Sequence, residues 1–259
     1  MLKKLYLGTN TKMYKTIEQT LDYLTQLDRL TRDISRETME LFVIPSFTAL
    51  ELARKCVPKE RILIGAQNMG WEERGEYTGE ISPLMLREVG VDIVEIGHSE
   101  RRHKLGETDE QENRKVLCAL KNGFTPLLCI GETAAQKQYD LGPETLRTQL
   151  KIGLYGVSPQ QADRVMIAYE PVWAIGESGQ PASVEYAEGM HRIIRETLIE
   201  LLGEAGSCTP VLYGGSVNLE NAEKLVTIPE VNGLFIGRSA WNAENFNTII
   251  RRVLPLYLK

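Results

Sequence analysis

Residues 165–176 read VMIAYEPVWAIG, in which the unbroken apolar run Val165–Tyr169 is followed at once by Glu170 and Pro171. A short apolar run without polar alternation is typical of a strand buried on both faces, as parallel sheets require. The glutamate then lies at the carboxyl end of that strand. The stretch therefore predicts a buried parallel strand that brings an acidic side chain to one edge of a sheet.

Seven further runs of the same kind occur along the chain. The eight predicted strands cover Leu5–Gly8, Glu40–Ile44, Ile62–Ala66, Val91–Ile96, Thr125–Cys129, Val165–Tyr169, Thr209–Tyr213 and Gly233–Ile236. Helical patterns fill most gaps between them. Two begin with capping-box spacings, at Thr16 and at Thr108, and the first continues in an apolar stripe. The members of that stripe are Ile17, Leu21, Leu24 and Leu27.

Eight strands that alternate with helices, without a Pro/Gly-rich linker, favour a single (β/α)8 TIM barrel domain over residues 1–259. An open doubly wound sheet is the alternative. The chain contains neither G-x-G-x-x-G nor G-x-x-x-x-G-K-[ST], so a nucleotide-binding fold lacks its best support.

The composition narrows the class of protein. The chain is 42% hydrophobic, which excludes wholesale disorder, and its net charge of −5 makes nucleic acid a poor partner. Its four cysteines show no C-x-x-C spacing and its three histidines no zinc-ligand spacing, so we expect free thiols and no metal. No signal peptide or membrane span is recognisable, and a cytoplasmic location without membrane contact is expected.

In a barrel, function lies at the carboxyl ends of the strands. The candidate functional residues that follow the predicted strands are Asn10, Lys12, His98, Glu100, Glu170, Gly176, Ser216, Gly237 and Arg238. This set combines a candidate base, an uncharged acid and a cation with glycine-containing loops whose backbone amides can hold an oxyanion or phosphate.

Several of these residues belong to longer motifs. The motifs are GHSERR at 97–102, AYEPVWAIG at 168–176, YGGSV at 213–217, GAQNM at 65–69 and TGE at 78–80. In this order and over nearly the full length, they resemble the triosephosphate isomerase family. The resemblance implies a (β/α)8 barrel, a homodimer, no cofactor, and isomerisation between an aldose and a ketose phosphate.

The resemblance also implies roles for the rim residues. Glu170 would be the base that moves a proton between adjacent carbons, and His98 a neutral imidazole that polarises the carbonyl. Lys12 would stabilise the enediolate, with Asn10 as a supporting amide. Glu100 would either bond Lys12 or relay protons, unless it is a structural ion-pair partner.

Backbone amides are expected to hold the phosphate, in loops that match the family's positions. These positions are Gly176, Ser216, Gly237 and Arg238. Cys129 matches a family cysteine, for which packing is the expected role. The loop Gln67–Glu80 carries Met69, Trp71 and Tyr77, apolar groups that we expect a monomer to expose. In the family, the corresponding loop inserts into the neighbouring subunit with Thr78 near that subunit's site.

Three departures bear on the substrate. Thr11 replaces the usual Trp, the lid reads GESGQPA at 176–182, and Arg238 replaces a second glycine after Gly237. The last two are similar to the branch that isomerises erythrulose phosphates in tetritol catabolism, so we favour a four-carbon sugar phosphate. Triosephosphate isomerase proper is the alternative. A non-catalytic phosphometabolite-binding barrel is a distant one, because binding alone needs neither base nor electrophile.

Arg238 itself admits three interpretations. Its guanidinium would contact the phosphate, reshape the pocket by pairing with an acidic residue such as Glu177, or point to solvent.

Overall fold

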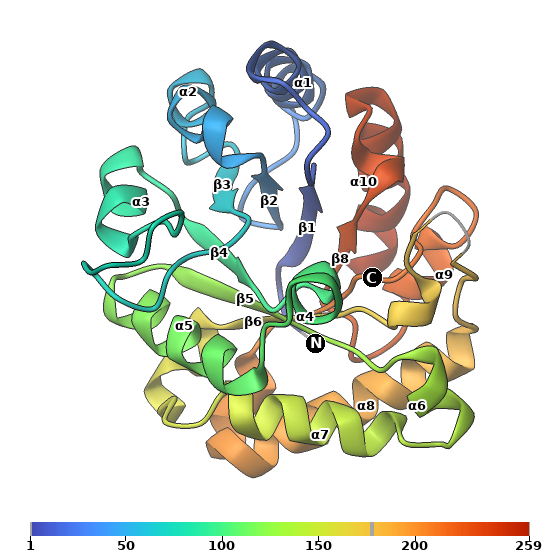
Figure 1. Ribbon diagram of the computed structural model, residues 1–259. Coiled ribbons are helices and arrows are strands. Elements are labelled where there is room, and N and C mark those ends of the chain that lie inside the picture. Colours follow the sequence, from blue (N-terminus) through green and yellow to red (C-terminus); the bar gives the residue numbers. More distant parts are fainter. Residues whose placement is uncertain (1, 177–178, 259) are drawn as a thin grey trace.

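The computed structural model describes residues 2–176 and 179–258. Within them eight strands pair in parallel, each with its neighbour in sequence, and β1 closes the sheet against β8 (Figure 1). The strands are β1 Leu5–Asn10, β2 Met39–Ile44, β3 Leu63–Ala66, β4 Ile93–Ile96, β5 Thr125–Ile130, β6 Met166–Tyr169, β7 Val211–Tyr213 and β8 Gly233–Ile236. The expected barrel is confirmed, and the open doubly wound sheet is excluded.

Most helices surround the barrel on its outside, whereas the short helix α4, Ser99–Leu105, lies in front of the centre of the ring of strands in the view of Figure 1. The α-helices are α1 Ile17–Leu30, α2 Leu50–Cys56, α3 Pro83–Val89, α4 Ser99–Leu105, α5 Asp109–Lys121, α6 Ala134–Gln138, α7 Gly142–Gly153, α8 Val184–Leu202, α9 Ala222–Val226 and α10 Ala243–Tyr257. Short 3₁₀ helices are η1 Phe47–Ala49, η2 Pro159–Arg164, η3 Val172–Ala174, η4 Gly203–Cys208 and η5 Arg238–Ala240. No helix in the described ranges is long and apolar enough to cross a membrane.

The predicted starts of two helices are confirmed. Thr16 and Thr108 each cap their helix in a complete capping box. The apolar stripe of α1 differs in one respect, because Ile17 is 39% exposed whereas Leu24 and Leu27 are buried. Ile17 is the first residue of the helix, and the buried face includes Tyr23, whose hydroxyl donates to the Ala240 carbonyl at 2.6 Å.

The barrel interior is filled by a core of its own, made of alternate strand residues. Its members are Phe42, Ile44, Ile93, Leu127, Cys129, Met166, Ala168, Leu212 and Phe235. Phe42 and Phe235 stack with ring centroids 5.8 Å apart. Gly8 is required beside them, because a Cβ there would lie 2.0 Å from the Phe42 ring. A filled interior leaves only the rim of the barrel for chemistry.

The loop between β3 and α3 differs from expectation at Met69. We expected Met69 to be exposed in a monomer, but it is fully buried in the main core. Tyr77 is 46% exposed and packs edge-on against Trp71, with ring centroids 5.8 Å apart. The apolar surface of this loop is therefore smaller than the sequence suggested and centres on Tyr77.

Candidate active site

A cavity of about 600 Å³ lies at the carboxyl ends of the strands. The structure brings all of the residues singled out from the sequence to its wall, from loops that follow five different strands. Those residues are Asn10, Lys12, His98, Glu100, Glu170, Gly176, Ser216, Gly237 and Arg238. Parallel strands end at the same edge, so residues far apart in sequence meet there.

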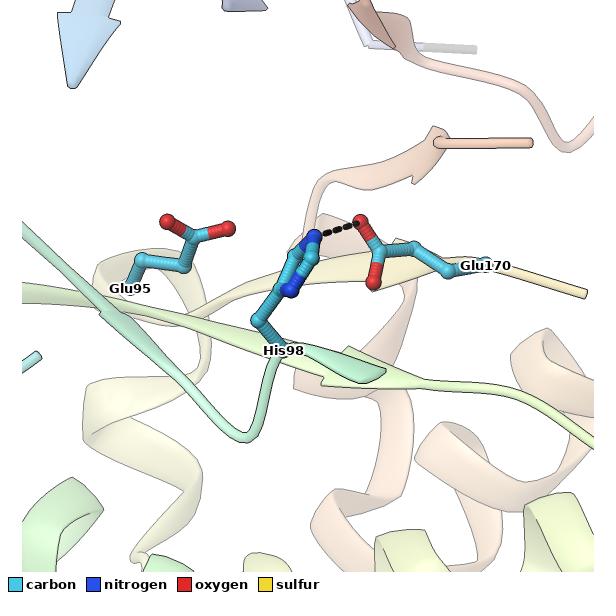
Figure 2. A group of neighbouring side chains, drawn as sticks. All are labelled: Glu95, His98 and Glu170. Atoms are coloured by element: carbon cyan, nitrogen blue, oxygen red, sulfur yellow. Dashed lines mark ion pairs between the residues drawn. The ribbon is translucent and has the colours of Figure 1, made fainter. Parts of the chain in front are cut away.

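Glu170 follows β6 directly and is only 3% exposed. Its Oε1 lies 3.7 Å from Nε2 of His98 (Figure 2). Among the described residues its Oε2 has no hydrogen-bond partner. Gly214 makes room for the side chain, since a Cβ there would lie 2.9 Å from the Glu170 Cγ. A buried carboxylate with an unused oxygen at a cavity wall is suited to accept a proton from a bound molecule.

His98 caps the N-terminus of α4 and is 5% exposed. Its Nδ1 accepts a hydrogen bond from the backbone N–H of Glu100 at 3.2 Å. A ring nitrogen that accepts cannot carry a proton, so the imidazole is neutral and its proton lies on Nε2. The positive end of the helix dipole favours the same neutral form. Nε2–H faces Glu170, where it can donate to an oxygen of a bound molecule.

Lys12 supplies a cation beside these two residues. Its Nζ lies 2.9 Å from Oε1 of Glu100. Its backbone has a φ of 52°, which is rare for a residue other than glycine. Two hydrogen bonds hold this conformation: the Lys12 N–H donates to Asn10 Oδ1 at 2.6 Å, and Gln67 Nε2 donates to the Lys12 carbonyl at 2.7 Å.

Glu100 makes the ion pair with Lys12 that was one of the roles expected for it. Burial would raise the pKa of Glu100, but the hydrogen bond from Lys12 and the positive charge of Lys12 outweigh burial and hold that pKa below its usual value. The carboxylate is therefore anionic at neutral pH and neutralises the cation until a ligand arrives.

Three glycine-containing loops complete the wall. Gly176 has a φ of 94°, and η5 starts directly after Gly237. Lys104 of α4 also lines the cavity, so that it adds a cation to those of Lys12 and Arg238. Cations and backbone amides around one opening favour an anionic ligand. The pairing expected between Arg238 and Glu177 involves a residue outside the described ranges.

Glu132 anchors the segment that follows Glu170. It is fully buried and accepts hydrogen bonds from Trp173 Nε1 at 2.7 Å, the Tyr186 hydroxyl at 3.0 Å and the Tyr169 hydroxyl at 3.1 Å. Trp173 lies in η3, three residues after Glu170. The start of the loop beside the candidate base is thus tied to β5 and α8. Sequence analysis did not assign this role to Glu132.

Comparison with known proteins identifies the family to which this site belongs. The triosephosphate isomerase family model matches residues 5–253.

The chain belongs to the triosephosphate isomerase family.

A crystal structure of triosephosphate isomerase from Bartonella henselae superposes with a TM-score of 0.87, covering 99% of this chain and all of that one at 33% identity. Relatives with a higher sequence identity to this chain are named as a different isomerase. An L-erythrulose-1-phosphate isomerase of Rhizobium etli is 45% identical over 96% of this chain and 92% of its own. One of Mesorhizobium japonicum is 43% identical over 95% of this chain and 96% of its own. The family predicted from the motifs is confirmed.

Cys129 lies against the site of this family member and is 1% exposed. Burial raises the pKa of its thiol well above the usual value, and the nearby Glu170 and Glu95 carboxylates raise it further. A thiol that stays protonated is a packing residue rather than a nucleophile, as expected for Cys129.

Sequence analysis missed one further residue of this triosephosphate isomerase family site. Glu95 in β4 is fully buried. One of its carboxylate oxygens lies within 4.8 Å of a ring nitrogen of His98 and of a carboxylate oxygen of Glu170 (Figure 2). The available signal was an acidic residue inside the apolar run Val91–Ile96. We had assigned that run only to a strand.

Proposed function

We propose that this isomerase moves the carbonyl group of L-erythrulose 1-phosphate, a four-carbon ketose phosphate, by proton transfer through an enediolate. The observation that carries the proposal is the relatedness to enzymes with that name, which are 41–45% identical, against 33% for the triosephosphate isomerase structure. Arg238, in place of the family's second glycine, lies at the cavity wall and supports a substrate other than a triose phosphate.

The chemistry of this substrate limits the products. Its carbonyl is on C2 and its phosphate on C1, so C1 has no hydroxyl to become a carbonyl. The proton must therefore leave C3 and return to C2, while the proton on O3 moves to O2. The product is erythrulose 4-phosphate, a second ketose. The aldose–ketose form of the reaction would apply only to triose phosphates.

The geometry supports a role for each polar side chain. Glu170 takes the C3 proton with a carboxylate oxygen and returns it to C2. His98 donates Nε2–H to the substrate oxygens and carries the proton between them. Lys12, held by Asn10, stabilises the negative charge that develops on those oxygens. These steps are acid–base chemistry throughout, and we propose no metal and no cofactor.

The phosphate would be held by the backbone at Gly176, Ser216, Gly237 and Arg238. Glycines allow the anion to approach the backbone closely, and the surrounding cations attract the dianion. A non-catalytic phosphate-binding barrel would need none of the arrangement around Glu170 and His98.

A substrate panel tests the proposal. The wild-type protein is assayed with both triose phosphates and with the L- and D-erythrulose phosphates, ranked by kcat/KM. We expect the highest value for an erythrulose phosphate. A triose phosphate at the top of the ranking would identify triosephosphate isomerase proper. If no substrate exchanges its carbon-bound hydrogen with solvent, the barrel is not an isomerase.

Arg238→Gly tests the specificity loop. We expect it to weaken the preference for the longer sugar phosphate by about tenfold, since a pocket distinguishes small groups by ~1–3 kcal/mol. If the guanidinium contacts phosphate, KM rises for every phosphorylated substrate. If Arg238 reshapes the pocket, the ratio of kcat/KM between substrates changes instead. Unchanged KM values and ranking would remove Arg238 from the specificity argument.

We also propose that residues 1–259 form one domain and that the protein is a cytoplasmic homodimer. The reduced state of Cys56, Cys118, Cys129 and Cys208 is compatible with that location.

The homodimer has its own test. Met13, next to Lys12, is 94% exposed, and Tyr77 in the loop 67–80 is 46% exposed. Exposed apolar groups of this kind mark an interface. In the proposed dimer the loop 67–80 brings Thr78 to the partner's site. Tyr77→Glu is expected to shift the sedimentation coefficient from dimer to monomer and to lower activity, whereas Tyr155→Glu, on another exposed tyrosine, should do neither. A fully active wild-type monomer at micromolar concentration would contradict the proposal.

A further inference from the structure

Glu95 is an ionisable residue in a part of the barrel that is otherwise built from apolar side chains. It shares the inward face of β4 with Ile93, a member of the interior core. It is fully buried. Burying a carboxyl group costs free energy unless the group is hydrogen-bonded. We therefore expect Glu95 to have hydrogen-bond partners and a function that retains it at this position.

The partners of Glu95 are groups of the active site. Asn10 Nδ2 donates to its Oε2 at 2.7 Å, and the Cys129 thiol donates to its Oε1 at 3.9 Å. On the other side its carboxylate faces His98 and Glu170. One carboxylate oxygen of each glutamate and one ring nitrogen of His98 all lie within 4.8 Å of one another (Figure 2). Glu95 therefore lies directly beside the reacting groups, on the side of His98 away from Glu170 (Figure 2).

The contact with Asn10 determines which way its amide points. Because Asn10 Nδ2 is bound by Glu95, its Oδ1 faces the other way and accepts from the Lys12 N–H at 2.6 Å and from Gln67 Nε2 at 3.0 Å. With the amide reversed, an NH₂ group would face the Lys12 N–H. The left-handed backbone of Lys12, with its φ of 52°, would then lose its acceptor.

The ionisation of Glu95 is adjusted by the same surroundings. Burial, and to a smaller extent the charge of Glu170, raise the pKa of Glu95, while the hydrogen bond from Asn10 and the charge of Lys12 lower it, and the net result is a pKa of about 7. Glu95 thus exchanges its proton close to neutral pH. The enediolate adds negative charge beside His98 and Lys12, which an anionic Glu95 opposes and a neutral Glu95 does not.

We propose that Glu95 is a positioning residue of this active site that acts in its protonated form: it orients Asn10, and through Asn10 the Lys12 cation, without adding a negative charge under the enediolate. This inference rests on the proposed function, because it assumes a reaction that builds up negative charge at this site.

Two substitutions separate the two parts of the proposal. Glu95→Gln keeps an oxygen for Asn10 but cannot ionise, and Glu95→Leu matches the apolar neighbours but leaves Asn10 Nδ2 without its acceptor. The kcat/KM of wild type and both variants is measured from about pH 6 to about pH 9.

We expect wild-type kcat/KM to fall about tenfold as the pH rises through about 7. Glu95→Gln should match wild type within about twofold at pH 6 and remain level above it. Glu95→Leu should raise KM about tenfold at every pH, because Lys12 helps to hold the dianionic substrate. A purely structural role would change the stability of the variants but not the shape of the pH profile.

Two outcomes would overturn the proposal: a Glu95→Gln profile with the same fall as wild type, or a Glu95→Leu enzyme with wild-type KM. Infrared difference spectra of wild type minus Glu95→Gln give a readout without turnover, since a carboxylic-acid band should be lost as the pH rises through about 7. If that band titrates and wild type isomerises none of the substrates in the panel, the proposed function fails instead. If wild type is active and the band is absent at pH 6, the Glu95 proposal fails.

Discussion

Glu170→Asp is expected to lower kcat about 10²-fold and to leave KM nearly unchanged. The shorter side chain keeps the carboxylate but withdraws it by roughly 1 Å from the carbon whose proton it must take, and a displacement of about 1 Å can cost ~10²-fold. Gly214 leaves room beside the Glu170 side chain, but the backbone at Glu170 cannot shift to compensate for the shorter aspartate, because β6 is paired with β5 and with β7. Binding should persist because, in the proposed function, other loops hold the phosphate.

Steady-state kinetics on the best substrate of the panel measure the effect. Glu185→Asp is the matched control, since it makes the same change on an exposed glutamate in the first turn of α8. The control should retain wild-type kcat. A Glu170→Asp enzyme with near-normal kcat would show that another group is the base.

His98→Gln is expected to lower kcat by about 10²–10³-fold, the usual cost of losing one donor at a developing oxyanion. Glutamine retains an N–H group, but an amide cannot release and regain a proton as the imidazole can. The backbone N–H of Glu100 also loses its Nδ1 acceptor, so the start of α4 is less firmly defined.

His103→Gln is the control for this substitution, because His103 is an exposed residue of the same helix and does not line the cavity. It should leave kcat unchanged. Equal losses in the two variants would indicate that damage to α4 explains the effect. A small loss confined to KM would show that His98 binds substrate without assisting proton transfer.

The rim residues were predictable because the fold brings strand ends together. Once eight buried strands alternate with helices, His98 after the fourth and Glu170 after the sixth must face the same opening. Nε2 of His98 and Oε1 of Glu170 are only 3.7 Å apart, although the two residues are 72 positions apart in the sequence. The motif around each residue then indicated which chemistry the opening supports.

Burial and partners were not predictable from the same patterns. Met69 was expected at the surface and is in the core, and Ile17 was expected in the core and is exposed. An apolar residue in a loop or a first helical turn has no periodicity to place it, so the surrounding chain decides. Glu132 and Glu95 illustrate the same limit for charged residues, because their hydrogen-bond partners come from other strands and helices.

The barrel, the family and the set of residues on the rim followed from the amino-acid sequence alone, because hydrophobic periodicity and contiguous motifs are local properties of the chain. The neutral tautomer of His98, the ion pair between Lys12 and Glu100, and the place of Glu95 beside His98 became apparent only from the folded chain. These features depend on distances between groups from different strands and on how little water reaches them. Closing the sheet sets both at once, since it brings the strand ends together and fills the interior with side chains.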